Sequence, residues 1–175
     1  PLVDSLYDLL QTGCDIRSED LKCTSVDGAG IQTGEEFVGW IKEKMENADL
    51  VILIVTPNYY ASKFCLAEMG AAWAMNKRVF PLVIPNIPRE IGIVMLGKQT
   101  AEMSDAGLDE LRDEIAKLFP QAGRSTPRWS VKKQGFISNL QKILAILPES
   151  NLIDRNAFTD EQEKVAASLE MIEEL

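Results

Sequence analysis

Two short runs of β-branched and aliphatic residues limit the possible folds more than any other feature of the chain. Leu50–Val55 reads Leu-Val-Ile-Leu-Ile-Val, and Val79–Ile84 reads Val-Phe-Pro-Leu-Val-Ile. A continuous apolar run of this length is typical of a strand that is covered on both faces, as in parallel sheets. Between the two runs, Ser62–Asn76 has the length and composition of a helix. A strand, a helix and a second buried strand in this order predict an α/β fold with a parallel sheet.

The remaining segments continue this alternation of strands and helices. A helix from Leu2 is expected to end at Gly13, because glycine is common just past the end of a helix. Asp27–Gly34 is a glycine-rich loop. The other patterns predict helices over Glu35–Asn47, Leu108–Leu118 and Val131–Leu147, and short strands over Leu21–Thr24 and Gln99–Met103.

The last part of the chain has a different character. Residues 149–175 hold eight acids and two bases, which supply −6 of the formal net charge of −9. Thr159–Gln162 fits a capping box at the start of a helix. We therefore expect two regions, a domain over residues 1–148 and an acidic linker and helix over 149–175 that leads to a further domain or a partner. Since the chain begins with Pro1 rather than Met, we also expect residues upstream of it.

The composition excludes several classes of function. The chain has no histidine, so it cannot supply a Ser-His-Asp or Cys-His catalytic site or a zinc site with His ligands. No metal site is expected. Three widely spaced cysteines argue for free thiols in a reducing cytoplasm rather than a disulfide framework. Residues 1–148 are close to neutral, so binding of nucleic acid through a broad basic surface is not expected. No signal peptide and no apolar run long enough to span a bilayer are present.

Glu68 is the residue that most needs a functional explanation. It is the only charged residue between Lys63 and Lys77, and on a helix it shares an apolar stripe with Phe64 and Ala72. A buried glutamate is rare unless a partner satisfies it. The glycine-rich loop and the Glu68 helix each follow a predicted parallel strand, so both should lie at the same edge of the sheet, where such folds bind their ligands.

These segments together resemble a Toll/interleukin-1 receptor (TIR) domain of the bacterial, NAD-hydrolysing type. The resemblance covers Leu21–Pro85 and extends less clearly to Leu147. It is carried by the glycine loop Asp27–Gly34, the helix from Glu35, the strand Leu50–Val55, the segment Thr56–Ser62, and the motif Ser62-x-x-Cys65-x-x-Glu68. The resemblance implies a flavodoxin-like three-layer sandwich with a central parallel sheet.

One feature of this family has no counterpart in the chain. Such domains usually begin with a strand at the middle of the sheet, whereas this chain starts at the helix that should follow it. A parallel sheet that lacks a central strand would leave two rows of backbone groups unpaired. We therefore expect the first strand to lie upstream of Pro1.

The resemblance also implies a reaction. It points to an NAD⁺ glycohydrolase or ADP-ribosyl cyclase, with NAD⁺ as the substrate and no separate cofactor. Such an enzyme would act in bacterial anti-phage immunity and would be activated by assembly. The implied partners are other TIR domains and a sensor domain or partner subunit joined through the C-terminal segment, with no nucleic acid or membrane bound directly.

The resemblance places the site around Glu68 as the catalytic residue. Phe64 could stack on the ligand or pack in the core. Ser62 fits a helix N-cap as well as a ligand contact, and Cys65 fits a small buried residue. Trp73 is expected in the core. The expected substrate-binding residues are Phe64, Ser62, Cys65, Asp27, Gly28, Gly30 and Ile31.

Two other functions remain open from the sequence. Many TIR domains act as non-enzymatic scaffolds that bind other TIR domains, although a scaffold has no need for an isolated glutamate. An enzyme similar to nucleoside deoxyribosyltransferases would also use a carboxylate on a related sheet. It would need a second acid close by, and the predicted Glu68 helix offers none.

Overall fold

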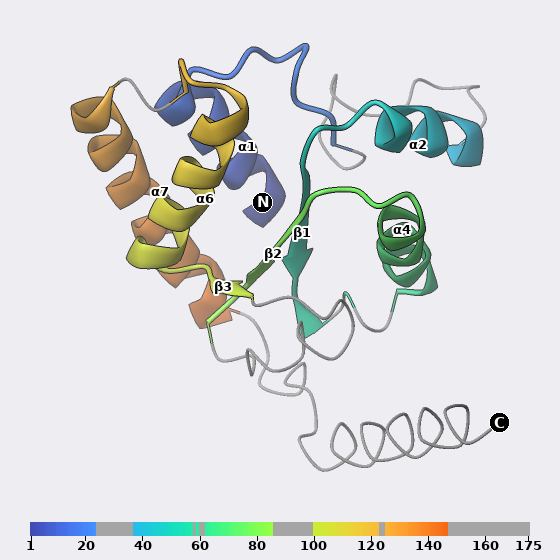
Figure 1. The fold of residues 1–175 in the computed structure, drawn as a ribbon. Coiled ribbons are helices and arrows are strands. Elements are labelled where there is room, and N and C mark those ends of the chain that lie inside the picture. The colour runs from blue at the N-terminus through green and yellow to red at the C-terminus, as the bar shows by residue number, and fades with distance from the viewer. Residues whose placement is uncertain (24–36, 58, 60–61, 86–99, 123–124, 147–175) are drawn as a thin grey trace, which may run out of the picture.

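The computed structural model describes residues 1–23, 37–57, 59, 62–85, 100–122 and 125–146. Helices and strands alternate along these residues (Figure 1). The elements are α1 (Leu2–Cys14), α2 (Phe37–Glu46), β1 (Val51–Val55), α4 (Lys63–Ala74), β2 (Val79–Val83), β3 (Ala101–Glu102), α6 (Asp105–Leu118) and α7 (Thr126–Ile146).

The described strands form one parallel sheet in the order β1-β2-β3. Val51 pairs with Val79 and Val55 with Val83, so the two apolar runs lie side by side in register. Figure 1 shows α1, α6 and α7 on one side of this sheet and α2 and α4 on the other. The three layers confirm the α/β prediction and are consistent with a flavodoxin-like fold.

The core lies between the sheet and the α1, α6 and α7 layer. The side chains of Leu82, Val83, Met103, Leu108 and Leu111 are fully buried there. Helix α1 packs on α7 and buries its leucines at helical spacing. Burial of these aliphatic groups is the main favourable contribution to the folded state, at roughly 25 cal/mol per Å² of apolar surface.

A buried polar cluster joins α6 to α7. The Lys133 side chain is only 5% exposed, and its Nζ lies 2.7 Å from an Asp109 carboxylate oxygen and 3.0 Å from one of Asp105. Trp129 Nε1 donates a hydrogen bond of 2.6 Å to the same Asp109. The two acids of α6 thus satisfy the buried cation of α7, as a charge in this position requires.

The structure corrects three local predictions. Gly13 does not end the first helix, because α1 continues to Cys14 and its cap is Asp15 in the left-handed conformation at φ 60°. Gly13 is instead a packing position, since a Cβ there would lie 3.0 Å from Cε3 of Trp129. The described residues 21–23 of the predicted Leu21–Thr24 strand lie outside any strand. Helix α7 begins at Thr126, five residues before the predicted Val131.

The other predicted elements are confirmed within a few residues of their expected ends. This holds for the helix Ser62–Asn76, in which Ser62 is the N-cap of α4, and for the short strand within Gln99–Met103. Residues 24–36 and 147–175 lie outside the described residues. The glycine-rich loop and the acidic tail therefore remain predictions.

Gly107 provides a test of how α6 is seated on the sheet. It lies in the first turn of α6, where its N–H donates to the Oγ of the N-cap Ser104 at 3.3 Å. A Cβ at this position would overlap the backbone carbonyl oxygen of Glu102. We expect Gly107→Ala to lower the free energy of unfolding by about 1–3 kcal/mol, measured by urea denaturation.

Gly135→Ala is the matched control for this substitution. Gly135 is exposed on α7, and nothing lies within 4 Å of a Cβ placed there. Alanine should raise the free energy of unfolding by about 0.5–1 kcal/mol at this site, because glycine is a poor helix former. Equal effects of the two substitutions would contradict the close contact between α6 and the end of β3.

Candidate active site

A series of hydrogen bonds connects the end of β1 to the start of α4. Thr56 follows β1, and its Oγ1 accepts a hydrogen bond of 3.2 Å from the N–H of Tyr59. The Tyr59 side chain is buried, and its hydroxyl donates to the carbonyl oxygen of Cys65 at 3.1 Å. The Oγ of Ser62 accepts from the N–H of Cys65 at 3.2 Å and so caps α4. These contacts fix where α4 begins relative to the sheet.

Helix α4 therefore starts at the carboxyl ends of the parallel strands. Figure 1 shows it running back along the sheet beside β1. Ala72 is fully buried, and Met69 and Met75 pack against the core. This face sets the rotation of the helix and leaves Glu68 half-buried in its second turn.

The Glu68 carboxylate has no hydrogen bond or ion pair with any residue in the described parts of the chain. Burial raises the pKa of this carboxyl group above its usual range, because the charged form loses part of its hydration. A desolvated acid without a partner is uncommon in a folded protein and is a typical feature of binding and catalytic sites. The catalytic role of Glu68 remains a prediction.

Among the other predicted site residues, the structure describes Ser62 and Cys65. Ser62 is the N-cap of α4, and Cys65 is half-buried. The side chain of Phe64 lies outside the described residues, as do Asp27, Gly28, Gly30 and Ile31. The binding roles of these residues remain predictions.

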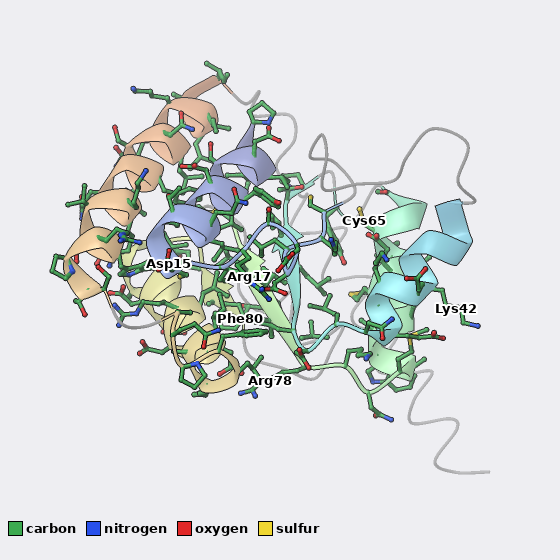
Figure 2. All side chains as sticks on the ribbon, turned by 90° about the horizontal axis from the view of Figure 1, so that it is seen from above. Asp15, Arg17, Lys42, Cys65, Arg78 and Phe80 are labelled. Atoms are coloured by element: carbon green, nitrogen blue, oxygen red, sulfur yellow. The ribbon has the colours of Figure 1, made fainter. Side chains whose placement is uncertain are left out.

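Thiol chemistry finds no support at Cys14, which lies outside this motif. Cys14 is fully buried, and burial raises the pKa of its thiol to about 12. It therefore stays protonated at neutral pH and is not a nucleophile. Figure 2 shows Cys65 on α4, across the sheet from Asp15 and Arg17 at the end of α1.

Two residues of this region were misjudged or overlooked in the sequence. Trp73 was expected in the core, but its side chain is 69% exposed on the outer face of α4. Tyr59 was not predicted to have a role, although it anchors the start of α4. Its position three residues after Thr56 and three before Ser62 was the available signal, because this spacing suits consecutive turns that cap one another.

A cavity in the described part of the chain is separate from this site. It has a volume of about 560 Å³ and is lined by residues of α1, β1 and α6 and of the segments that follow α1 and α2. None of the predicted site residues lines it. The candidate site is therefore defined by Glu68 and the edge of the sheet at which the strands end.

Comparison with known proteins supports the resemblance to a TIR domain. Residues 10–119 match the TIR domain family. The chain is also 27% identical over 106 residues to the uncharacterized protein YddK of Bacillus subtilis (strain 168), an alignment that covers 59% of this chain and 40% of the relative. The chain thus spans less than half the length of that relative. No solved structure gives a significant match.

The raised pKa of Glu68 predicts how the site affects stability. A carboxyl group whose pKa is higher in the folded state destabilises the fold once it ionises. This destabilisation is absent below the ordinary pKa of glutamate and is complete above the raised pKa. We expect Glu68→Gln to unfold at the same or a higher temperature than the parent chain at neutral pH, with the difference shrinking toward acid pH. A lower unfolding temperature at neutral pH would show that the carboxylate has a stabilising partner.

Proposed function

Because the chain belongs to the TIR domain family, we propose that it cleaves the bond between nicotinamide and ribose in NAD⁺, as a glycohydrolase or ADP-ribosyl cyclase. One observation carries this proposal: the half-buried Glu68, without a partner among the described residues, on the helix that starts at the carboxyl ends of the strands. Ligands bind at this edge in open parallel sheets.

The chemistry of NAD⁺ explains how one carboxylate can be sufficient. Most glycosidases need a second carboxyl group to protonate the leaving group. Nicotinamide leaves a cationic pyridinium as a neutral molecule, so it needs no proton. In hydrolysis, a water molecule then attacks the ribose carbon and releases a proton to solvent, while Glu68 has two tasks. Its carboxylate accepts hydrogen bonds from the ribose hydroxyls, and its charge stabilises the positive charge that develops on the ribose in the transition state.

Partial burial of Glu68 helps its carboxylate to stabilise the positive charge that develops on the ribose. A charge acts more strongly on a nearby charge when water is excluded, because the local dielectric constant is lower. The hydrogen bonds from Thr56 through Cys65 hold the first turn of α4 in place, so the backbone that carries Glu68 is already positioned when the substrate binds. The protein accepts the destabilisation of a desolvated acid, as is common at active sites.

Nicotinamide release from NAD⁺ tests the proposal. We expect Glu68→Gln to lower the rate by at least about a hundredfold, because the substitution keeps the shape and removes the charge. Glu110→Gln is the matched control, since Glu110 is an exposed acid on α6 and should leave the rate unchanged. Equal rates for parent and Glu68→Gln, with both folded, would exclude Glu68 as the catalytic residue.

A second function is favoured by the outer face of α4. Trp73 is 69% exposed, and the neighbouring exposed positions on this face are Ala67, Gly70 and Ala74. An exposed tryptophan on a smooth apolar surface is typical of protein contacts. We propose that this face mediates association with other TIR domains, either to activate the enzyme in the cytoplasm of a bacterium defending itself against phage, or as a scaffold without catalysis. No helix in the described residues is long and apolar enough to cross a membrane.

Substitution of Trp73 tests whether this face mediates association, and it separates an enzyme that assembly activates from a scaffold without catalysis. Trp73→Ala should weaken self-association by about tenfold or more in sedimentation velocity experiments across a concentration series. Val131→Ala is the control, because Val131 is 73% exposed on α7 and lies away from this face. If the enzyme is activated by assembly, nicotinamide release per molecule should fall with association. Association without nicotinamide release at any concentration would favour the scaffold, and unchanged association would exclude this face as the interface.

A further inference from the structure

The three described strands contain a single charged residue, Glu102 at the end of β3. Every residue of β1 and β2 is apolar, and Ala101 precedes Glu102 in β3. Glutamate is depleted in strands, and most of all where both faces of a sheet are covered by helices. The Glu102 side chain is half-buried. Packing alone gives no reason for an acid at this position.

The register of the sheet places Glu102 at the edge where the parallel strands end. Glu102 pairs with Val83, and Val83 pairs with Val55, so the last residues of the three strands lie level with one another. Helix α4 begins at this edge after its cap, Ser62. Two strand spacings separate β3 from β1, a distance of roughly 10 Å. Glu102 therefore lies at the ligand-binding edge of an open parallel sheet, beside the Glu68 helix in the order of strands.

The register also shows which face of the sheet Glu102 occupies. Ile54, Leu82 and Ala101 pair across the sheet and share one face. Ile54 lines the cavity that residues of α1 and α6 also line, so this face is turned toward those helices. Successive residues of a strand point to opposite faces. Glu102 therefore points to the other face, on which Figure 1 shows α2 and α4.

Glu68 approaches the same region from α4. It lies one helical turn before Ala72, so both side chains are on one side of the helix. Ala72 is fully buried against the core, which identifies this side as the one that faces the sheet. Glu68 and Glu102 thus share one face and one edge of the sheet. A ligand bound at this edge would have a carboxylate of α4 near one part and a carboxylate of β3 near another.

The backbone at Glu102 is held on both sides. The N–H of Met103 donates to the carbonyl oxygen of Val83 at 2.6 Å, which ties the end of β3 to β2. The carbonyl oxygen of Glu102 accepts a hydrogen bond of 2.7 Å from the N–H of Ser104. Gly107 approaches the same carbonyl so closely that a Cβ there would overlap it. The Glu102 side chain therefore starts from a fixed point, which is what a residue that selects a ligand requires.

We propose that Glu102 is a second substrate-binding residue, which accepts hydrogen bonds from the hydroxyls of the adenosine ribose and so selects NAD⁺ over NADP⁺. This inference rests on the proposed function. NAD⁺ has two ribose units joined through a pyrophosphate, and the proposed reaction assigns the nicotinamide ribose to Glu68. Dinucleotide-binding folds recognise ribose hydroxyls with a carboxylate, and they accommodate the 2′-phosphate of NADP⁺ with an arginine.

The charge of Glu102 explains the selectivity. A carboxylate only accepts hydrogen bonds, so it matches the two O–H donors of a ribose diol. The 2′-phosphate of NADP⁺ replaces one donor with a negative group, which a nearby carboxylate repels. Glutamine has nearly the same shape without the charge. Glu102→Gln should therefore weaken the binding of NAD⁺ and reduce the rejection of NADP⁺.

Nicotinamide release from NAD⁺ and from NADP⁺ tests the proposal. In the parent, kcat/KM for NAD⁺ should exceed that for NADP⁺ by about a hundredfold. Glu102→Gln should raise KM for NAD⁺ about tenfold, leave kcat within about twofold, and lower the preference for NAD⁺ to less than about tenfold. Glu102→Asp keeps the charge and should retain most of the preference. Glu110→Gln is the matched control and should change neither KM nor the preference, because Glu110 is an exposed acid on α6.

Binding measured by calorimetry separates this inference from the proposed function. Glu68→Gln should bind both dinucleotides with little cleavage, so their Kd values can be compared with and without Glu102→Gln. If the parent released no nicotinamide, the proposed function would fail. A preference for NAD⁺ in binding that Glu102→Gln removes would then still support the role of Glu102.

Three results would overturn the role of Glu102. An unchanged preference in folded Glu102→Gln, with nicotinamide still released, would exclude Glu102 alone and leave NAD⁺ cleavage intact. A fall in kcat at constant KM and constant preference would place Glu102 at the reacting ribose instead of the adenosine ribose. Failure of the folded protein to bind either dinucleotide would overturn both the role of Glu102 and the proposed function.

Discussion

The parallel pairing of β1 with β2 is the constraint on which the rest of this structure depends. It places Val55 beside Val83, so both strands end at the same edge. Each strand must then be followed by a connection that returns along the face of the sheet. Helix α4 is the connection that runs back along the sheet after β1, and α6 is the one after β3. The core forms where α6 meets the sheet.

The position of Glu68 is a consequence of this pairing. Ala72 and the neighbouring methionines of α4 pack against the core, which fixes the rotation of the helix, while Ser62 and Tyr59 fix its start. Glu68 then has to lie half-buried near the edge at which the parallel strands end. Its raised pKa follows from burial, and no described residue offers it a hydrogen bond or a cation. In the proposed enzyme, the positive charge of the NAD⁺ transition state supplies what the fold does not.

The sequence alone predicts the elements whose pattern is strong. The apolar runs of β1 and β2 and the Ser62 cap of α4 could be located to within a residue or two, because strand burial and helix capping leave local signals. The exposure of Trp73 could not be predicted, since α4 is apolar on nearly all sides and its periodicity does not show which face meets the sheet. The role of Gly13 was also hidden, because its contact partner Trp129 is distant in sequence. Residues 21–23 have the composition of a strand, but they lie outside the described sheet.

The dependence of nicotinamide release on pH, measured beside the NMR titration of the Glu68 carboxyl group, tests the central claim most directly. If ionised Glu68 carries the reaction, the rate should rise with pH along a single acidic limb whose midpoint equals the pKa of Glu68. That midpoint should lie above the usual range for glutamate. A midpoint within the ordinary range, or a rate that does not follow the ionisation of Glu68, would contradict the proposed role of this carboxylate.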